Sequence, residues 1–196
     1  MPTIGLFLIF NFDETRFLWI PSSEMQLFLY VVTCVTTFLL PLLNAFTLFK
    51  MKYISSFEMK TKEERKIPYL FSAVFYSSES YFLMHCDVPV LIKALMLGAA
   101  LLVVSVLLIN LFWKISAHMV GIGGLFGMII AISSRLEVNL LDIIILLILI
   151  SGIVGWARLQ LSAHSQAQVY IGFLLGVLVE WQLFSPYPIP FLPAQG

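Results

Sequence analysis

Charged residues are scarce in this 196-residue chain, at 11% of the total, whereas hydrophobic residues make up 60%. Soluble domains carry roughly 25% charged residues, because a surface in contact with water must be covered with polar groups. The chain therefore cannot form an ordinary soluble domain. Its formal net charge is zero, so there is no basic footprint for nucleic acid. Its two cysteines, Cys34 and Cys86, are too few for a disulfide framework.

Long apolar runs fill most of the sequence, and lipid forces them into helices because it cannot satisfy open backbone groups. The runs cover residues 25–49, 67–84, 88–113, 115–134, 140–157 and 166–184. They predict an all-α integral membrane protein, a bundle of about six transmembrane helices with a four-helix core. The second run is the most polar, with four serines and Glu79, so it can be tilted, buried among its neighbours, or short of a full span.

The two ends of the chain differ from this apolar region. Residues 1–24 form a short apolar segment followed by a break with charged residues. The apolar segment is too short to cross a membrane, and it has no basic leader typical of a signal peptide. Residues 185–196 contain four prolines, which cannot extend a helix and predict an extended tail. Residues 25–184 are the expected membrane domain.

The basic residues indicate an orientation. Residues 50–66 hold six of the eleven lysines and arginines, and the positive-inside rule places such a loop in the cytoplasm. An even number of spans then puts Lys114 and Arg158 on that same face. Lys114 follows Trp113 and is interpreted as an anchor at the membrane interface.

Three polar segments on that face interrupt the helices, at residues 60–68, 114–118 and 158–168. Together they supply cations, a hydroxyl group and the imidazoles of His118 and His164. Phosphoryl transfer requires such a set, with positive groups to hold the anion, a nucleophile, and an acid for the leaving oxygen.

The order and spacing of these segments resemble the signature of the type 2 phosphatidic acid phosphatase superfamily. That signature reads Lys-x6-Arg-Pro, then Pro-Ser-Gly-His, then Ser-Arg-x5-His-x3-Asp. The first part corresponds here to Lys60-x6-Ile67-Pro68, the second to Ile115-Ser116-Ala117-His118, and the third to Ala157-Arg158-x5-His164-x3-Gln168. The likeness covers roughly residues 25–184, and the Arg-x5-His spacing is its most specific element.

The resemblance implies a bacterial inner (plasma) membrane phosphatase that hydrolyses a phospholipid or polyprenyl phosphate. His164 would attack phosphorus to form a phosphohistidine, and His118 would protonate the leaving alcohol and later activate water. Phosphate oxygens would be held by Lys60, Ser116 and Arg158, with Arg65 or Lys66 replacing the arginine missing at position 67. The family requires no metal or other cofactor.

Gln168 stands where the family has an aspartate that would orient the nucleophilic imidazole and stabilise its charge. An amide can orient the ring but supplies no charge. The alternatives are therefore a slow enzyme and a catalytically silent relative that binds lipid phosphate without hydrolysing it.

Other features of the apolar runs have different interpretations. Glu79 and Glu180 are acids in apolar surroundings, which are costly there and usually face a partner or a cavity. They support a rival function as a transporter or lipid-flipping protein. The pairs Gly123-xxx-Gly127 and Gly172-xxx-Gly176 predict close helix packing. The sequence His85-Cys86-Asp87 has metal-ligand residue types, but three adjacent side chains diverge and do not form a metal site.

Overall fold

The computed structural model describes residues 2–11, 21–59 and 61–184, and this part of the chain is helical without any strand. The break at 12–20, Lys60 and the proline-rich tail at 185–196 lie outside the described residues. The helices are α1 (Pro2–Asn11), α2 (Ser23–Cys34), the π-helix η2 (Val35–Leu39), α3 (Leu40–Lys50), α4 (Lys62–Met84), α5 (Val90–Phe112), α6 (Ala117–Leu136), α7 (Leu141–Gln160) and α8 (Gln166–Phe184). The six predicted apolar runs thus each form helix, the first of them as α2, η2 and α3 in succession.

Five helical segments are long and apolar enough to cross a membrane. These candidate spans are Ser23–Lys50, Val90–Phe112, Ala117–Leu136, Leu141–Gln160 and Gln166–Phe184. Helix α4 has the length, at 23 residues, but it is not among them, because even its more apolar part, residues 67–84, contains four serines, three tyrosines and Glu79. The composition and these helices are those of a helical integral membrane protein.

Large apolar side chains cover the outside of the bundle. Ile153 on α7 and Leu178 on α8 are each 65% exposed, and similar residues lie along α2, α3 and α4. Monomeric soluble proteins rarely expose contiguous apolar surface on this scale. Lipid removes the cost of this exposure, so the outer surface agrees with the composition.

Helix α4 begins five residues before the predicted start at Ile67, because a capping box forms there. The Thr61 hydroxyl accepts the backbone N–H of Glu64, and the Glu64 carboxylate accepts the backbone N–H of Thr61. Pro68 lies inside the helix rather than ending it. The earlier start places Arg65 on a regular helix instead of in a loop.

The predicted glycine faces are confirmed where α6 meets α8. A Cβ atom on Gly123 would lie 2.1 Å from the carbonyl oxygen of Phe173, and one on Gly176 would lie 2.2 Å from that of Val120. These approaches leave no room for a side chain, so the two backbones touch directly. This contact fixes the N-terminus of α8 beside that of α6.

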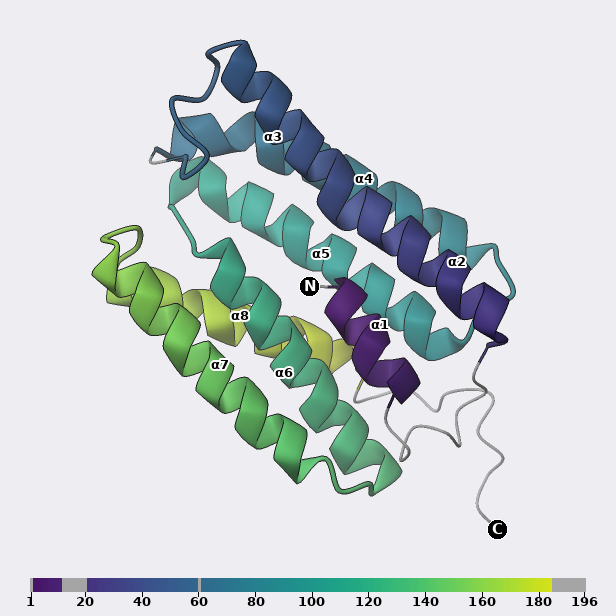
Figure 1. Cartoon of the computed structure of the whole chain (residues 1–196). Helices are drawn as coiled ribbons and strands as arrows, with labels where there is room; N and C mark the ends of the chain where they lie inside the picture. Colours follow the sequence, from purple (N-terminus) through teal and green to yellow (C-terminus); the bar gives the residue numbers. More distant parts are fainter. Residues whose placement is uncertain (1, 12–20, 60, 185–196) are drawn as a thin grey trace.

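The helices run roughly along one another, and the loops α3–α4, α5–α6 and α7–α8 gather at one end of the bundle (Figure 1). Helix α1 lies against α5, where Leu6, Ile9 and Phe10 are buried in the main apolar core. The short apolar segment predicted at the N-terminus thus forms a helix of 10 residues. The three predicted polar segments therefore meet at the loop-bearing end.

Candidate functional site

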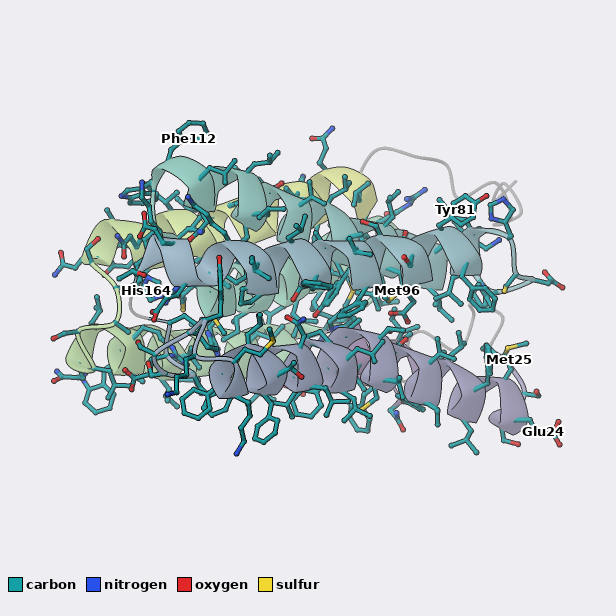
Figure 2. All side chains as sticks on the ribbon, turned by 90° about the horizontal axis from the view of Figure 1, so that it is seen from above. Glu24, Met25, Tyr81, Met96, Phe112 and His164 are labelled. Carbon is teal, nitrogen blue, oxygen red and sulfur yellow. The ribbon has the colours of Figure 1, made fainter. Side chains whose placement is uncertain are left out.

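The site lies at the end of the bundle where three loops meet. Figure 2 shows His164 and Phe112 at this same end of the bundle, whereas Glu24, Met25 and Tyr81 lie at the opposite end. The backbone N–H of Ser116 donates to the Gln168 carbonyl (3.3 Å), and Lys114 Nζ donates to the Ala163 carbonyl (2.7 Å). These two bonds join the second polar segment to the third.

Arg65 joins the first segment to the other two. It is 7% exposed, and its Nε donates to the Met59 carbonyl (2.8 Å) while one terminal nitrogen donates to the Glu58 carbonyl (3.2 Å). The other terminal nitrogen lies 3.5 Å from the Ile115 carbonyl oxygen and 3.5 Å from His164 Nε2. The planar fork of a guanidinium suits such a junction. One guanidinium thus holds the loop before α4 and also faces the imidazole.

His164 is oriented by Gln168, four residues later. Its Nδ1 lies 3.0 Å from Gln168 Oε1, which also accepts the backbone N–H of Ser165 (3.2 Å). Since Oε1 only accepts and the guanidinium of Arg65 only donates, Nδ1 carries the proton and the lone pair of Nε2 accepts from Arg65. The Ser165 hydroxyl accepts the Gln168 backbone N–H (3.4 Å), which completes a capping-box pattern at the start of α8. The lone pair points to the side where Arg65 lies.

The surroundings of His164 keep the ring neutral. Burial lowers its pKa from 6.5 to about 4, the positive charges of Arg65, Lys114 and Arg158 act in the same direction, and the hydrogen bond with Gln168 opposes them. Burial and the charge of Arg65 also lower the pKa of Lys114. At neutral pH, His164 is therefore an unprotonated imidazole surrounded by cations.

Two polar groups at the site are buried without a hydrogen bond to any described residue. They are Nε of Arg158 and the hydroxyl of Ser116, a residue that is 0% exposed. A buried donor without an acceptor costs about 1–3 kcal/mol, so such groups are uncommon. Both are donors, and an anion with several acceptor oxygens matches them.

The remaining predicted site residues take different places. His118 is exposed as the second residue of α6, and the charges of Arg158 and Arg65 act on it as they act on His164. Lys66 is exposed on α4, and no hydrogen bond joins it to the site within the described part of the chain. Lys60 lies outside the described residues. The structure therefore brings Arg65, Ser116, Arg158, His164 and Gln168 together, with His118 at the edge.

Two contributors were missed by the sequence. Lys114 donates to the Ala163 carbonyl, next to His164, instead of reaching outward as an interfacial anchor. The short spacing from Lys114 to His118 could have suggested that Lys114 belongs to the site. Tyr69 lies one turn after Arg65, and its hydroxyl accepts from the guanidinium (3.4 Å), a contact that follows from the i, i+4 spacing once α4 is known to be helical.

Within residues 2–11, 21–59 and 61–184, no group of three histidine, cysteine, aspartate or glutamate side chains could hold a metal ion. No family model, curated protein or solved structure matches this chain.

Proposed function

We propose that this protein is a metal-independent phosphatase for lipid phosphates, with His164 as nucleophile. The observation that carries the proposal is the state of this imidazole. Gln168 holds the proton on Nδ1, the pKa is about 4, and Nε2 lies 3.5 Å from a guanidinium. An unprotonated nitrogen beside fixed cations is what attack on a phosphate anion requires.

The proposed reaction has two displacements. In the first, Nε2 of His164 bonds to phosphorus, the bond from phosphorus to the lipid oxygen breaks, and His118 gives its proton to that oxygen. In the second, His118 takes a proton from water, the water oxygen bonds to phosphorus, and the bond to Nε2 breaks. The products are the lipid alcohol and inorganic phosphate.

The anion would be held by Arg158, Ser116 and Arg65. The buried Nε of Arg158 and the buried hydroxyl of Ser116 have no acceptor among the described residues, and phosphate oxygens would satisfy both. Arg65 already binds three backbone carbonyls, so its contribution is mainly its charge and the position of the loop. Lys60 is proposed as a further phosphate ligand, and Lys66, which is exposed, is the weakest candidate in the set.

In this proposal α4 is the sixth span, and α4, α5, α6 and α8 form the four-helix core in the plasma membrane of a bacterium. The site then faces the cytoplasm, since residues 50–66 carry six of the eleven basic residues. A phospholipid or polyprenyl phosphate would reach the site from the bilayer.

A cysteine-labelling experiment tests this topology. With the other cysteines replaced, a cysteine at Lys62 should react with an impermeant maleimide only after the cells are opened, whereas native Cys86 should react in intact cells. Equal labelling of both in intact cells would show that α4 does not cross the membrane.

A catalytically silent phosphate binder is the second candidate, and Gln168 is the observation that favours it. The amide holds the correct tautomer but offers no negative charge to the imidazolium-like phosphohistidine. Such a protein would bind vanadate through Arg158 and release no phosphate.

The deciding experiment measures phosphate release by protein in nanodiscs from phosphatidate, phosphatidylglycerophosphate and a polyprenyl diphosphate. His164→Ala should abolish both release and trapping of a phosphoprotein, and His118→Ala should slow both displacements. His85→Ala is the matched control, because His85 is exposed at the opposite end of α4, where its imidazole contacts the carbonyl and the ring of Tyr81. If the wild-type protein releases phosphate and the His164→Ala variant still releases it, the proposed mechanism is ruled out. No release, with vanadate binding that depends on Arg158, identifies the silent binder.

A further inference from the structure

A cavity of about 220 Å³ lies in the bundle and is lined by residues of α4, α5, α6 and α8, together with Pro2 of α1, Thr37 of η2 and Pro41 of α3. Tyr69 and Ala117 line it on the side of the candidate site, and Glu180 lines it from α8. Most of the other lining side chains are aliphatic, such as Leu102 and Val106. An engineered apolar cavity of about 150 Å³ is large enough for benzene, so this one can hold a small organic molecule.

Glu180 is the unusual member of this lining. It is 3% exposed, and its Oε2 is buried without a hydrogen bond to any described residue. Helix α5 makes room for the carboxyl group with Gly98, where an added Cβ atom would lie 2.4 Å from both carboxyl oxygens. A second glycine, Gly124 on α6, lies beside the Glu180 side chain. The acid therefore occupies a space that two neighbouring helices leave open for it.

Glu79, the other acid in an apolar run, is different because the protein satisfies it. Its two carboxyl oxygens accept hydrogen bonds from the hydroxyls of Thr33 (2.6 Å) and Thr36. These threonines flank the start of η2, so the bonds join α4 to the first span. Glu79 thus has a structural role, and Glu180 lacks an equivalent explanation.

Helix α4 contributes Tyr69, Ser72 and Tyr76 to the lining, and their hydroxyl groups make hydrogen bonds to other parts of the protein. Tyr76 donates to the Thr37 carbonyl (3.1 Å), and Ser72 donates to the Pro68 carbonyl (2.9 Å). Within the described part of the chain, no lysine, arginine or histidine lines the cavity. Glu180 therefore has no basic side chain as a partner among these residues, and a cation in the cavity would meet no competing basic side chain there.

We propose that this cavity binds a small lipophilic organic cation, with the Glu180 carboxylate as its counter-ion. The Tyr69 and Tyr76 rings, which line the cavity, can supply cation–π attraction, a usual means of holding quaternary ammonium groups. The aliphatic lining accepts the apolar part of the same molecule. This binding site is separate from the phosphate chemistry and does not depend on it.

The test compares a cation with its uncharged isostere. Tritiated benzyltrimethylammonium is bound to purified protein in nanodiscs, and neopentylbenzene, which has carbon in place of the charged nitrogen, is the unlabelled competitor. Wild type should prefer the cation at least tenfold, and Glu180→Gln should remove that preference. Glu79→Gln is the matched control, a buried acid that should leave the preference unchanged.

A second variant covers the case in which Glu180→Gln fails to fold. Ala99→Leu enlarges a lining residue of α5 and keeps the carboxylate, so it should reduce cation binding at least tenfold. Equal affinity for the cation in wild type and both variants overturns the proposal, and so does equal competition by neopentylbenzene in wild type. Phosphate release should be unaffected by Glu180→Gln, which separates a failure here from a failure of the proposed phosphatase.

Discussion

Changing Gln168 to glutamate places a negative charge beside His164 without altering the length of the side chain. The amide oxygen already lies 3.0 Å from Nδ1, so a glutamate oxygen can take the same place. An aspartate, which is the residue of the resembling family, is one methylene shorter and would not reach as far. Gln168→Glu is therefore the sharper test of what charge does at this position.

The size of the effect follows from the surroundings of the imidazole. The difference between a pKa of 6.5 and one of about 4 corresponds to about 3.4 kcal/mol against the protonated ring, at about 1.36 kcal/mol for each pKa unit. A carboxylate about 4 Å from the ring contributes about 4 kcal/mol at an effective dielectric constant of about 20. We therefore expect the pKa of His164 to return to about 6–7.

The assay is an NMR titration of ¹³C-labelled histidine, with phosphate release measured in parallel at pH 8, where His164 is neutral in both proteins. We assume that half of the interaction energy of the carboxylate, about 2 kcal/mol, stabilises the positive charge of the phosphohistidine. The rate of phosphate release should then rise about thirtyfold. Gln166→Glu is the matched control, because Gln166 is exposed in the same first turn of α8. A pKa that moves by less than one unit, or equally in both variants, would refute the arrangement of His164 and Gln168.

Three further predictions concern the site and its support. As the pH is lowered, kcat/KM should decrease with an apparent pKa near 4 and not near 6.5, because protonation removes the lone pair of His164 and the pKa of this residue is about 4. A decrease with an apparent pKa near 6.5 would contradict the burial and the neighbouring cations of His164. Arg65→Lys keeps the charge but loses the fork that binds three carbonyls, so thermal unfolding in detergent should show that the free energy of unfolding falls by about 1.5–3 kcal/mol. Lys66→Arg, at an exposed position, should leave this free energy unchanged. Equal effects of the two changes would show that Arg65 does not hold the loop. Gly176→Ala should lower the free energy of unfolding by about 1–3 kcal/mol in the same assay, because the added methyl group overpacks α6 against α8. Gly152→Ala should not lower it, since a Cβ atom there meets nothing within 4 Å. Similar losses for both variants would contradict the close packing.

The positions of the helices followed closely from the sequence. The last apolar run was predicted at 166–184 and forms α8 with the same bounds, and apart from the start of α4 the other boundaries differ by three residues at most. Hydropathy works here because lipid leaves the backbone few choices. The larger error, at the start of α4, occurred because local hydrogen bonds between Thr61 and Glu64 extend a helix through charged residues that hydropathy assigns to a loop.

Part of the candidate site was also readable in the chain. The i, i+4 spacing of His164 and Gln168 places an acceptor beside the imidazole as soon as α8 begins near residue 166. The convergence of the three polar segments followed from an even number of crossings. The functional roles of these residues remain predictions, because spacing identifies neighbours and not chemistry.

That this protein is helical and suited to a membrane can be read from the chain alone, because these properties depend on local apolarity and backbone hydrogen bonding. The packing of the helices was needed to learn that Glu79 is hydrogen-bonded whereas Glu180 faces a cavity. It was also needed to learn that Arg65, and not Lys66, meets His164. Such distinctions depend on the rotation of each helix about its axis, which is fixed by side-chain packing between segments as far apart in the chain as Arg65 and His164. Hydropathy places a helix along the chain but leaves that rotation open.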